Sequence, residues 1–224
     1  MKRILFQGDS ITDACRDREH LDNLGIGYPT LVKAELGFEN PEEFDFQNRG
    51  ISGNRIVDVY ARIKLDIINL KPDYLSILIG VNDVWHELSR QNGVDAEKYE
   101  KIYCMMLDEI YAALPDVKIM ILEPFVLEGS ATCNTEEEPD KWNIFNTEVK
   151  KRAQKARSVA QKYNIPFIPL QDKFDSVSEN TENSYWLSDG VHPTTMGHEL
   201  IKREWMKHFT EIQKKFTLKL LHLS

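Results

Sequence analysis

A serine, a histidine and an aspartate stand where they could act together in acyl transfer. Ser10 follows a short apolar run, Ile4 to Phe6, within the sequence Gly8-Asp9-Ser10. Asp189 and His192 are three residues apart near the other end of the chain, so one tight turn can present both side chains on the same side. An imidazole held by a carboxylate can take the proton of a serine hydroxyl and turn that hydroxyl into a nucleophile.

Each of these features also has an ordinary structural interpretation. Gly-Asp-Ser is a common turn, because all three residue types favour turns. Asp189 is explained equally well as the N-cap of a following helix, with His192 incidental. The pair could also bind a metal ion, although no further Cys or His flanks it at a useful spacing. What the rest of the chain places beside Ser10 decides among these interpretations.

Five apolar segments alternate with helical patterns and predict a doubly wound α/β fold. We expect a three-layer αβα sandwich with a five-stranded parallel, flavodoxin-like sheet, forming one domain over residues 1–216 and followed by an apolar tail at 217–224. The segment 172–184 is expected to be irregular or partly helical, and the last helix to span about 195–215. The predicted strands are Ile4 to Phe6, Phe44 to Phe46, Tyr74 to Ile79, Lys118 to Leu122 and Ile165 to Leu170.

Three of these strands end in polar turns, and parallel strands bring such turns to one edge of the sheet. The turns are Gly8-Asp9-Ser10, Asn48 to Asn54 and Gly80 to Asp83. Gly53 has no Cβ, so its N–H can approach a ligand closely, and Asn82 offers a side-chain amide donor. With the Ser10 N–H they would form a three-donor oxyanion hole.

Several polar segments near these turns have simpler interpretations. The charged segment from Asp13 to Asp22 is interpreted as a solvated loop, and Val126 to Asp140 as a mobile insertion of the kind that forms a lid or rim. Asp9 is expected to brace its turn. Histidines other than His192 are interpreted as structural or surface residues, and His86 is noted because it stands near Asn82.

Composition narrows the classes of partner. The 224 residues carry a net charge of −8 and a pI near 5.3, which argues against a nucleic-acid-binding surface. No signal peptide or membrane-length apolar run is visible, and the 3 cysteines are widely spaced without a CxxC, so we expect a cytoplasmic protein with no disulfide frame or zinc site. The apolar tail makes a homo-oligomer a fair expectation, and no cofactor is expected.

The motifs resemble those of the SGNH hydrolases, the GDSL-like esterase family. The matching blocks are Gly8 to Asp13, Asn48-x-Gly50-x-x-Gly53, Gly80-x-Asn82-Asp83 and Asp189-x-x-His192-Pro193. The resemblance implies that Ser10 is the nucleophile, that Gly53 and Asn82 complete the oxyanion hole, and that Asp189 and His192 complete the triad. It implies no metal.

Three longer stretches are similar to bacterial acetylxylan esterases and related carbohydrate deacetylases: Asn48 to Asn54, Ile79 to Trp85 and Pro124 to Gly129. This likeness implies removal of acetyl groups from sugars such as xylo-oligosaccharides through an acyl-enzyme. A lysophospholipid, a thioester, an O-acetylated sialic acid or another short-acyl ester is the alternative substrate. A phosphate- or nucleotide-binding module is the non-enzyme alternative, although no turn has the glycines and lysine of a phosphate cradle. The candidate substrate contacts are Asp9, Tyr28, Trp85 and Trp186.

Overall fold

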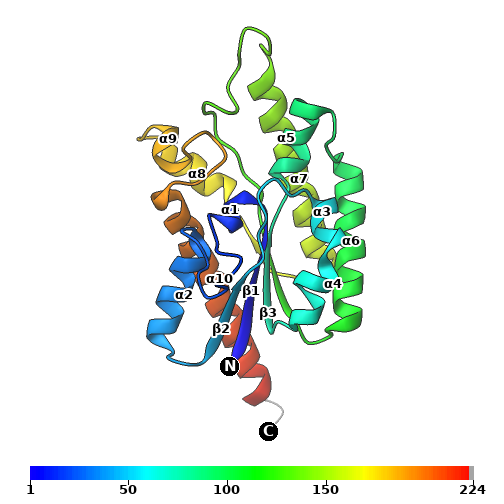
Figure 1. The fold of residues 1–224 in the computed structure, drawn as a ribbon, viewed down its shortest axis with the longest axis vertical. Coiled ribbons are helices and arrows are strands. Elements are labelled where there is room, and N and C mark those ends of the chain that lie inside the picture. The colour runs from blue at the N-terminus through cyan, green and yellow to red at the C-terminus, as the bar shows by residue number, and fades with distance from the viewer. Residues whose placement is uncertain (222–224) are drawn as a thin grey trace.

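Five parallel strands form one sheet in the order β2-β1-β3-β4-β5, with helices on both faces (Figure 1). The computed structural model describes the backbone of residues 1–221 and the side chains of residues 1–214. The strand order is that of flavodoxin-like doubly wound sheets, so the predicted three-layer α/β fold is confirmed. The strands are β1 (Lys2–Gly8), β2 (Phe44–Asn48), β3 (Tyr74–Leu78), β4 (Lys118–Leu122) and β5 (Phe167–Ile168).

Two helical layers enclose the sheet (Figure 1). One face is covered by α2 (Tyr28–Glu39) and α10 (Thr195–Leu221), and the other by α3 (Ile56–Ala61), α4 (Ile63–Asp66), α6 (Ala96–Ala113) and most of α7 (Lys141–Lys162). The remaining elements are α1 (Ser10–Asp13), a 3-10 helix η1 (Ile68–Leu70), α5 (Val81–Arg90), α8 (Gln171–Ser178) and α9 (Asn183–Trp186).

The central strand β3 shows why the sheet lies between two layers. All five of its residues are buried, as expected for a parallel strand covered on both faces. Tyr74 and Leu78 belong to one hydrophobic cluster, while Leu75 and Ile77 belong to the other. Successive side chains of a strand point to opposite faces, so this one strand connects both halves of the core.

The register of the strands brings the three polar turns together. Gly8 at the end of β1 is paired with Leu78 at the end of β3, and Phe6 of β1 is paired with Asn48 at the end of β2. The segments that follow therefore begin side by side at one edge of the sheet. Ile51 confirms the proximity, because its N–H donates to the carbonyl oxygen of Gly8 at 3.1 Å.

Some element boundaries differ from those expected. The last strand is only Phe167–Ile168, because Pro166 and Pro169 on either side have no N–H to donate to the sheet. The segment 172–184 contributes to two short helices, α8 and α9, and the last helix continues to Leu221. The side chains of 217–224 lie outside the described residues, so the packing of the apolar tail and a homo-oligomer stay predictions.

The insertion 126–140 is only partly a surface loop. Its first half is hydrogen-bonded to the segment that carries Asp189, since Leu127 N–H donates to the carbonyl oxygen of Gly190 and Ala131 N–H to that of Asp189, both at 2.9 Å. Thr132 is completely buried there. Residues 126–133 therefore support the turn beside them, and the mobile lid or rim expected over 126–140 stays a prediction.

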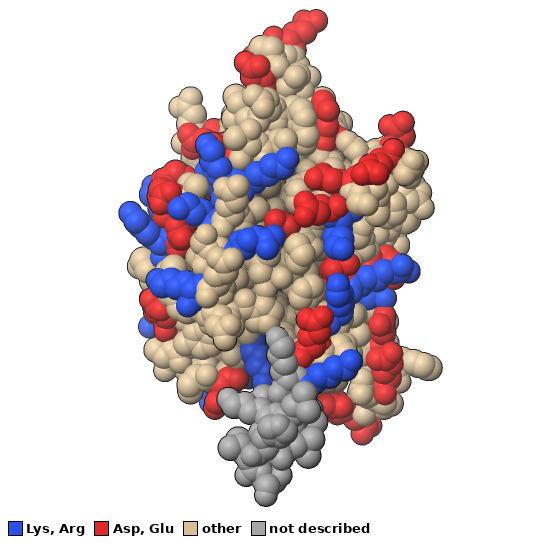
Figure 2. Space-filling model, turned by 180° about the vertical axis from the view of Figure 1, so that it is seen from behind, with Lys and Arg blue, Asp and Glu red and all other residues tan. Residues whose placement is uncertain are grey.

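Charged side chains of both signs are interspersed on the face shown in Figure 2. On the helical layers, Lys155 of α7 pairs with Glu97 and Glu100 of α6 at 2.8 and 2.7 Å. Within the described residues, no helix is long and apolar enough to cross a membrane.

Candidate active site

Three side chains form a continuous hydrogen-bonded row at the edge where β1 ends. The Oγ of Ser10 lies 2.9 Å from Nε2 of His192, and Nδ1 of His192 lies 2.7 Å from Oδ2 of Asp189. Ser10 is the first residue of α1, directly after the turn that closes β1. The structure thus brings together the three residues that the sequence predicted from opposite ends of the chain.

The aspartate is held rigidly by its own turn. Oδ1 of Asp189 accepts the backbone N–H groups of Val191 and His192 at 2.9 and 2.8 Å, which leaves Oδ2 for the imidazole. The N–H of Ser188 donates to the carbonyl oxygen of His192 at 2.8 Å and closes the turn. These contacts explain the Asp-x-x-His spacing: one carboxylate both shapes the turn and orients the ring within it.

The electrostatics of this pair suit a base. Burial raises the pKa of Asp189, but the hydrogen bonds from the His192 ring and from two backbone N–H groups outweigh it and lower the pKa to about 2. The hydrogen bond to Asp189 raises the pKa of His192 above its ordinary value, against the opposing effect of burial. An ionised Asp189 favours the tautomer with the proton on Nδ1, so Nε2 is free to accept the Ser10 proton.

Donors for an oxyanion lie on the neighbouring turns. Gly53 has φ of +80°, a backbone conformation that favours glycine. Within the described chain, neither its N–H nor that of Ser10 donates a hydrogen bond. The side-chain amide of Asn82 donates one N–H to the carbonyl oxygen of Asn54 at 3.2 Å and keeps a second N–H available. Asn82 also stands in the first turn of α5, where the helix dipole favours negative charge.

A clamp connects the Gly53 turn to α5. We define it by three contacts: Asn82 to Asn54, Asp83 to the N–H of Ile56, and Arg55 to the carbonyl oxygen of Asn92. Asp83 is completely buried, which raises the pKa of its carboxyl well above the ordinary value. Because Asn82 and Asp83 are adjacent, the clamp places two of the three candidate oxyanion donors on one braced unit.

Sequence reasoning missed a second brace, between the Ser10 and Gly53 turns. Asp13 is 3% exposed, and its Oδ2 accepts the N–H of Ser52 at 3.0 Å. Arg16, 8% exposed, donates from Nε to the carbonyl oxygen of Gly50 at 2.7 Å. The interpretation of Asp13 to Asp22 as a solvated loop is therefore wrong at its start. The missed signal was the closeness of Asp13 to Ser10, one helical turn away.

Asn48 extends this brace from the end of β2. Its Nδ2 donates to the carbonyl oxygens of Thr12 and Leu24 at 2.6 and 2.9 Å, and its Oδ1 accepts the N–H of Gly50 at 2.9 Å. The side chain is 5% exposed, so its polar atoms are satisfied by protein groups. The Asn48 side chain thus holds three segments together, which explains why asparagine stands at the start of the motif Asn48-x-Gly50-x-x-Gly53.

Two candidate substrate contacts are buried away from any ligand, and those predictions are wrong. Asp9 is 1% exposed; its Oδ1 accepts the N–H of Ile11 and caps α1, so it braces the turn. Tyr28 is completely buried, with its hydroxyl 3.2 Å from Oγ1 of Thr12 and its ring edge against Phe6. Both side chains lie in the protein interior. The helical or turn spacing in the sequence could not by itself show whether they were buried or exposed.

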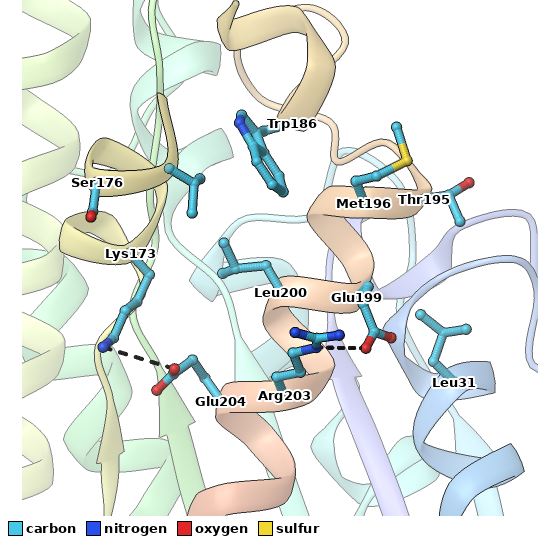
Figure 3. Close-up of a pocket in the computed structure, with 11 residues that line it drawn as sticks. Leu31, Lys173, Ser176, Trp186, Thr195, Met196, Glu199, Leu200, Arg203 and Glu204 are labelled. Atoms are coloured by element: carbon cyan, nitrogen blue, oxygen red, sulfur yellow. Dashed lines mark hydrogen bonds and ion pairs between the residues drawn. The ribbon is translucent and has the colours of Figure 1, made fainter. Parts of the chain in front are cut away.

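The two candidate tryptophans, Trp85 and Trp186, lie in different places. The ring of Trp85 lies beside the base, with its centroid 5.9 Å from that of His192. The ring of Trp186 instead enters a different pocket of about 590 Å³ between α8, α9 and α10, where it points toward Leu200 (Figure 3). Neither Ser10 nor His192 lines that pocket, so a contact of Trp186 with the sugar side of the serine site stays a prediction. Its backbone still supports the site, because its carbonyl oxygen accepts the N–H of Thr194 at 2.9 Å.

A metal ion is the other ligand that the sequence left open for the Asp189–His192 pair. In the part of the chain that is described, no group of three or more His, Cys, Asp or Glu side chains is placed to hold a metal ion.

Comparison with known proteins gives a consistent result. A family model described as the GDSL-like lipase/acylhydrolase family matches residues 6–200. An acetylxylan esterase of Geobacillus stearothermophilus is 33% identical over 220 residues, which cover 92% of this chain and 93% of that protein. The crystal structure of Axe2, an acetylxylan esterase from the same organism, matches with a TM-score of 0.79 at 30% identity over 92% of this chain and 93% of that one. Two solved variants of that esterase, described as catalytic mutants, carry alanine in place of an aspartate and of a serine.

Two further crystal structures share the fold over nearly the whole chain. One, from Parabacteroides merdae and described as a GDSL-like lipase, has a TM-score of 0.82 at 35% identity, over 92% of this chain and 94% of that one. The other is LAE5, described as an alpha/beta hydrolase enzyme from the metagenome of Lake Arreo, Spain. It has a TM-score of 0.80 at 28% identity, over 92% and 94% of the two chains.

Proposed function

Because this chain belongs to the GDSL-like lipase/acylhydrolase family and is a carboxylic ester hydrolase, we propose that Ser10, His192 and Asp189 are its catalytic triad. We further propose that it removes acetyl groups from sugar hydroxyls, as on acetylated xylo-oligosaccharides. The observation that carries the first proposal is the row of contacts of 2.9 and 2.7 Å from Ser10 through His192 to Asp189.

The first half of the reaction forms the acyl-enzyme. His192 Nε2 takes the proton of Ser10 as Oγ attacks the acyl carbon, and Asp189 stabilises the resulting imidazolium. The negative oxygen of the tetrahedral intermediate accepts hydrogen bonds from the N–H groups of Ser10 and Gly53 and from the Asn82 amide. His192 then gives its proton to the leaving alcohol as the carbon–oxygen bond breaks.

The second half returns the enzyme to its starting state. A water molecule loses a proton to His192 as its oxygen attacks the acyl carbon. The same donors hold the second tetrahedral intermediate. The proton returns to Oγ of Ser10 as the acyl–oxygen bond breaks, and the free acid leaves. The cycle uses only the ester, water and groups of the protein.

Three observations support a sugar acetate as the substrate. The relative of 33% identity is an acetylxylan esterase, and solved variants of Axe2 from the same organism are described as an acetyl-xylooligosaccharide esterase. Ser10 is only partly buried, and the His192 side chain is 39% exposed, which leaves room for a bulky alcohol. The partly buried ring of Trp85 beside His192 offers an apolar surface against which a sugar ring could stack.

The test is release of acetate from acetylated xylo-oligosaccharides, with Ser10→Ala as the control. We expect steady release by the wild type and none above background by the variant. A panel of nitrophenyl esters with two, four and eight acyl carbons and a lysophospholipid separates the alternatives. Preference for the long acyl chain would overturn the carbohydrate assignment, and full activity of Ser10→Ala would overturn the triad. Because the chain belongs to a hydrolase family, the non-enzyme alternative of a phosphate- or nucleotide-binding module is not pursued further.

A further inference from the structure

His86 lies at the active site, although its sequence context suggested a structural or surface residue. On α5 it is four residues after Asn82 and one after Trp85, and residues three and four apart share one face of a helix. Asn82 is a proposed oxyanion donor and Trp85 is beside His192. The face of α5 that carries His86 is therefore the face turned toward the reacting groups.

Gly53 gives the position of the imidazole more closely. A Cβ built on Gly53 would have Nε2 of His86 as its one neighbour within 4 Å, at 3.9 Å. Gly53 and His86 are both partly exposed. They thus border the same open space, immediately beside a proposed oxyanion donor, and no side chain from residue 53 separates the imidazole from a bound ester.

Within the described chain, the ring nitrogens of His86 make no hydrogen bond, so they are available to a ligand. The charged groups that face His86 are Arg55, Arg90 and Asp58. Arg55 and Asp58 are engaged with each other at 2.9 Å. Burial, then the charges of the two arginines, lower the pKa of His86, so the ring is neutral near pH 7 with one N–H donor and one acceptor.

The two ring nitrogens of His86, one a donor and one an acceptor, can both hydrogen-bond a hydroxyl group. They cannot hydrogen-bond the methyl of an acetyl group. We propose that His86 is a specificity residue that hydrogen-bonds a free sugar hydroxyl next to the acetylated one. This inference rests on the proposed function. It predicts that the enzyme favours partly acetylated sugars over acetate esters whose alcohol has no neighbouring hydroxyl.

The test compares His86→Ala, His86→Gln and the wild type on three acetate esters. The first is a monoacetylated methyl xyloside with a free neighbouring hydroxyl, the second is the fully acetylated methyl xyloside, and the third is 4-nitrophenyl acetate. Loss of one neutral hydrogen bond should lower kcat/KM of His86→Ala about 3- to 10-fold on the first ester. We expect less than a twofold change on the other two, and partial recovery on the first with His86→Gln. His208→Ala, on α10, serves as a control that changes none of the three rates.

Each other outcome has a definite meaning. An equal loss on all three esters overturns the proposal, because it indicates a structural or general catalytic role. Faster hydrolysis of nitrophenyl butyrate by His86→Ala, with the monoacetylated xyloside unaffected, also overturns it and places His86 beside the acyl group. If the wild type releases acetate from 4-nitrophenyl acetate but from neither xyloside, the proposed sugar substrate fails and the inference fails with it. If the wild type deacetylates the xylosides and His86→Ala matches it on all three, only the inference fails.

Discussion

Replacing Asn82 with alanine should nearly abolish catalysis and leave the protein folded. The side chain is 5% exposed, and one of its amide N–H groups is spent on the carbonyl oxygen of Asn54 at 3.2 Å. The other is the one that we assign to the oxyanion. Removing one such donor typically lowers kcat by about 100- to 1,000-fold, which is about 3 to 4 kcal/mol of transition-state stabilisation. Losing the contact to Asn54 should cost only about 1 kcal/mol of folding free energy.

The two costs can be measured separately. Thermal unfolding should show Tm lowered by about 2–4 °C for a domain of this size, while kcat on 4-nitrophenyl acetate falls at least 100-fold with little change in KM. Asn82→Asp keeps the shape of the side chain, lacks the donor and should be no more active. Asn69→Ala, at an exposed asparagine in η1, is the matched control and should behave as wild type. A folded Asn82→Ala enzyme that keeps a third or more of kcat would refute the oxyanion assignment.

Three further predictions concern pH and the backbone. The hydrogen bond to Asp189 raises the pKa of His192, so kcat/KM on an uncharged ester should rise with pH through an inflection above 6.5. A rate profile measured from pH 5 to 9 with a lower inflection would contradict the assignment of His192 as the base. Burial raises the pKa of Asp9 to about 7, so this carboxyl favours the folded state most below pH 3.8 and progressively less up to pH 7. Asp9→Asn keeps the helix cap, and urea unfolding should show its stability relative to wild type growing by about 3 kcal/mol from pH 4 to 7, because the slope of about 1.4 kcal/mol per pH unit becomes smaller near the two pKa values. A constant difference would show that Asp9 is ionised throughout. Gly190 has φ of +97°, and a Cβ there would lie 2.5 Å from the carbonyl oxygen of Leu127, so Gly190→Ala should lower stability by more than about 2 kcal/mol in the same assay.

Much of the fold was predictable because a doubly wound sheet follows simple rules. The strand β3 is apolar except for Ser76, and the turns after β1, β2 and β3 all carry glycine with Ser, Asn or Asp. Parallel pairing then brings those turns to one edge without further information. The boundaries of β5 were less predictable, because Pro166 and Pro169 remove the N–H groups that would extend it.

The surroundings of the site were harder to predict, since they depend on which way side chains point. Asp13 and Arg16 look like part of a charged loop until the fold brings Gly50 and Ser52 against them. Tyr28 lies in the core although its sequence context equally suggested a substrate contact. The cytoplasmic location, the single-domain boundary at residue 216 and the oligomeric state stay predictions.

The braces around the site divide it into a fixed half and an open half. Asp13 and Asn48 hold the Gly53 turn to the Ser10 turn, and Asp83 holds it to α5. The base is fixed in its own turn, which the segment 126–133 supports from outside. In the proposed mechanism, all these contacts hold the groups that meet the acyl carbon and its oxygen. Donors that are already in place need the least rearrangement when charge develops there. The alcohol side, by contrast, is bordered by exposed parts of Trp85 and His86. Under the proposed mechanism, this division assigns the choice of alcohol to the outer face of α5.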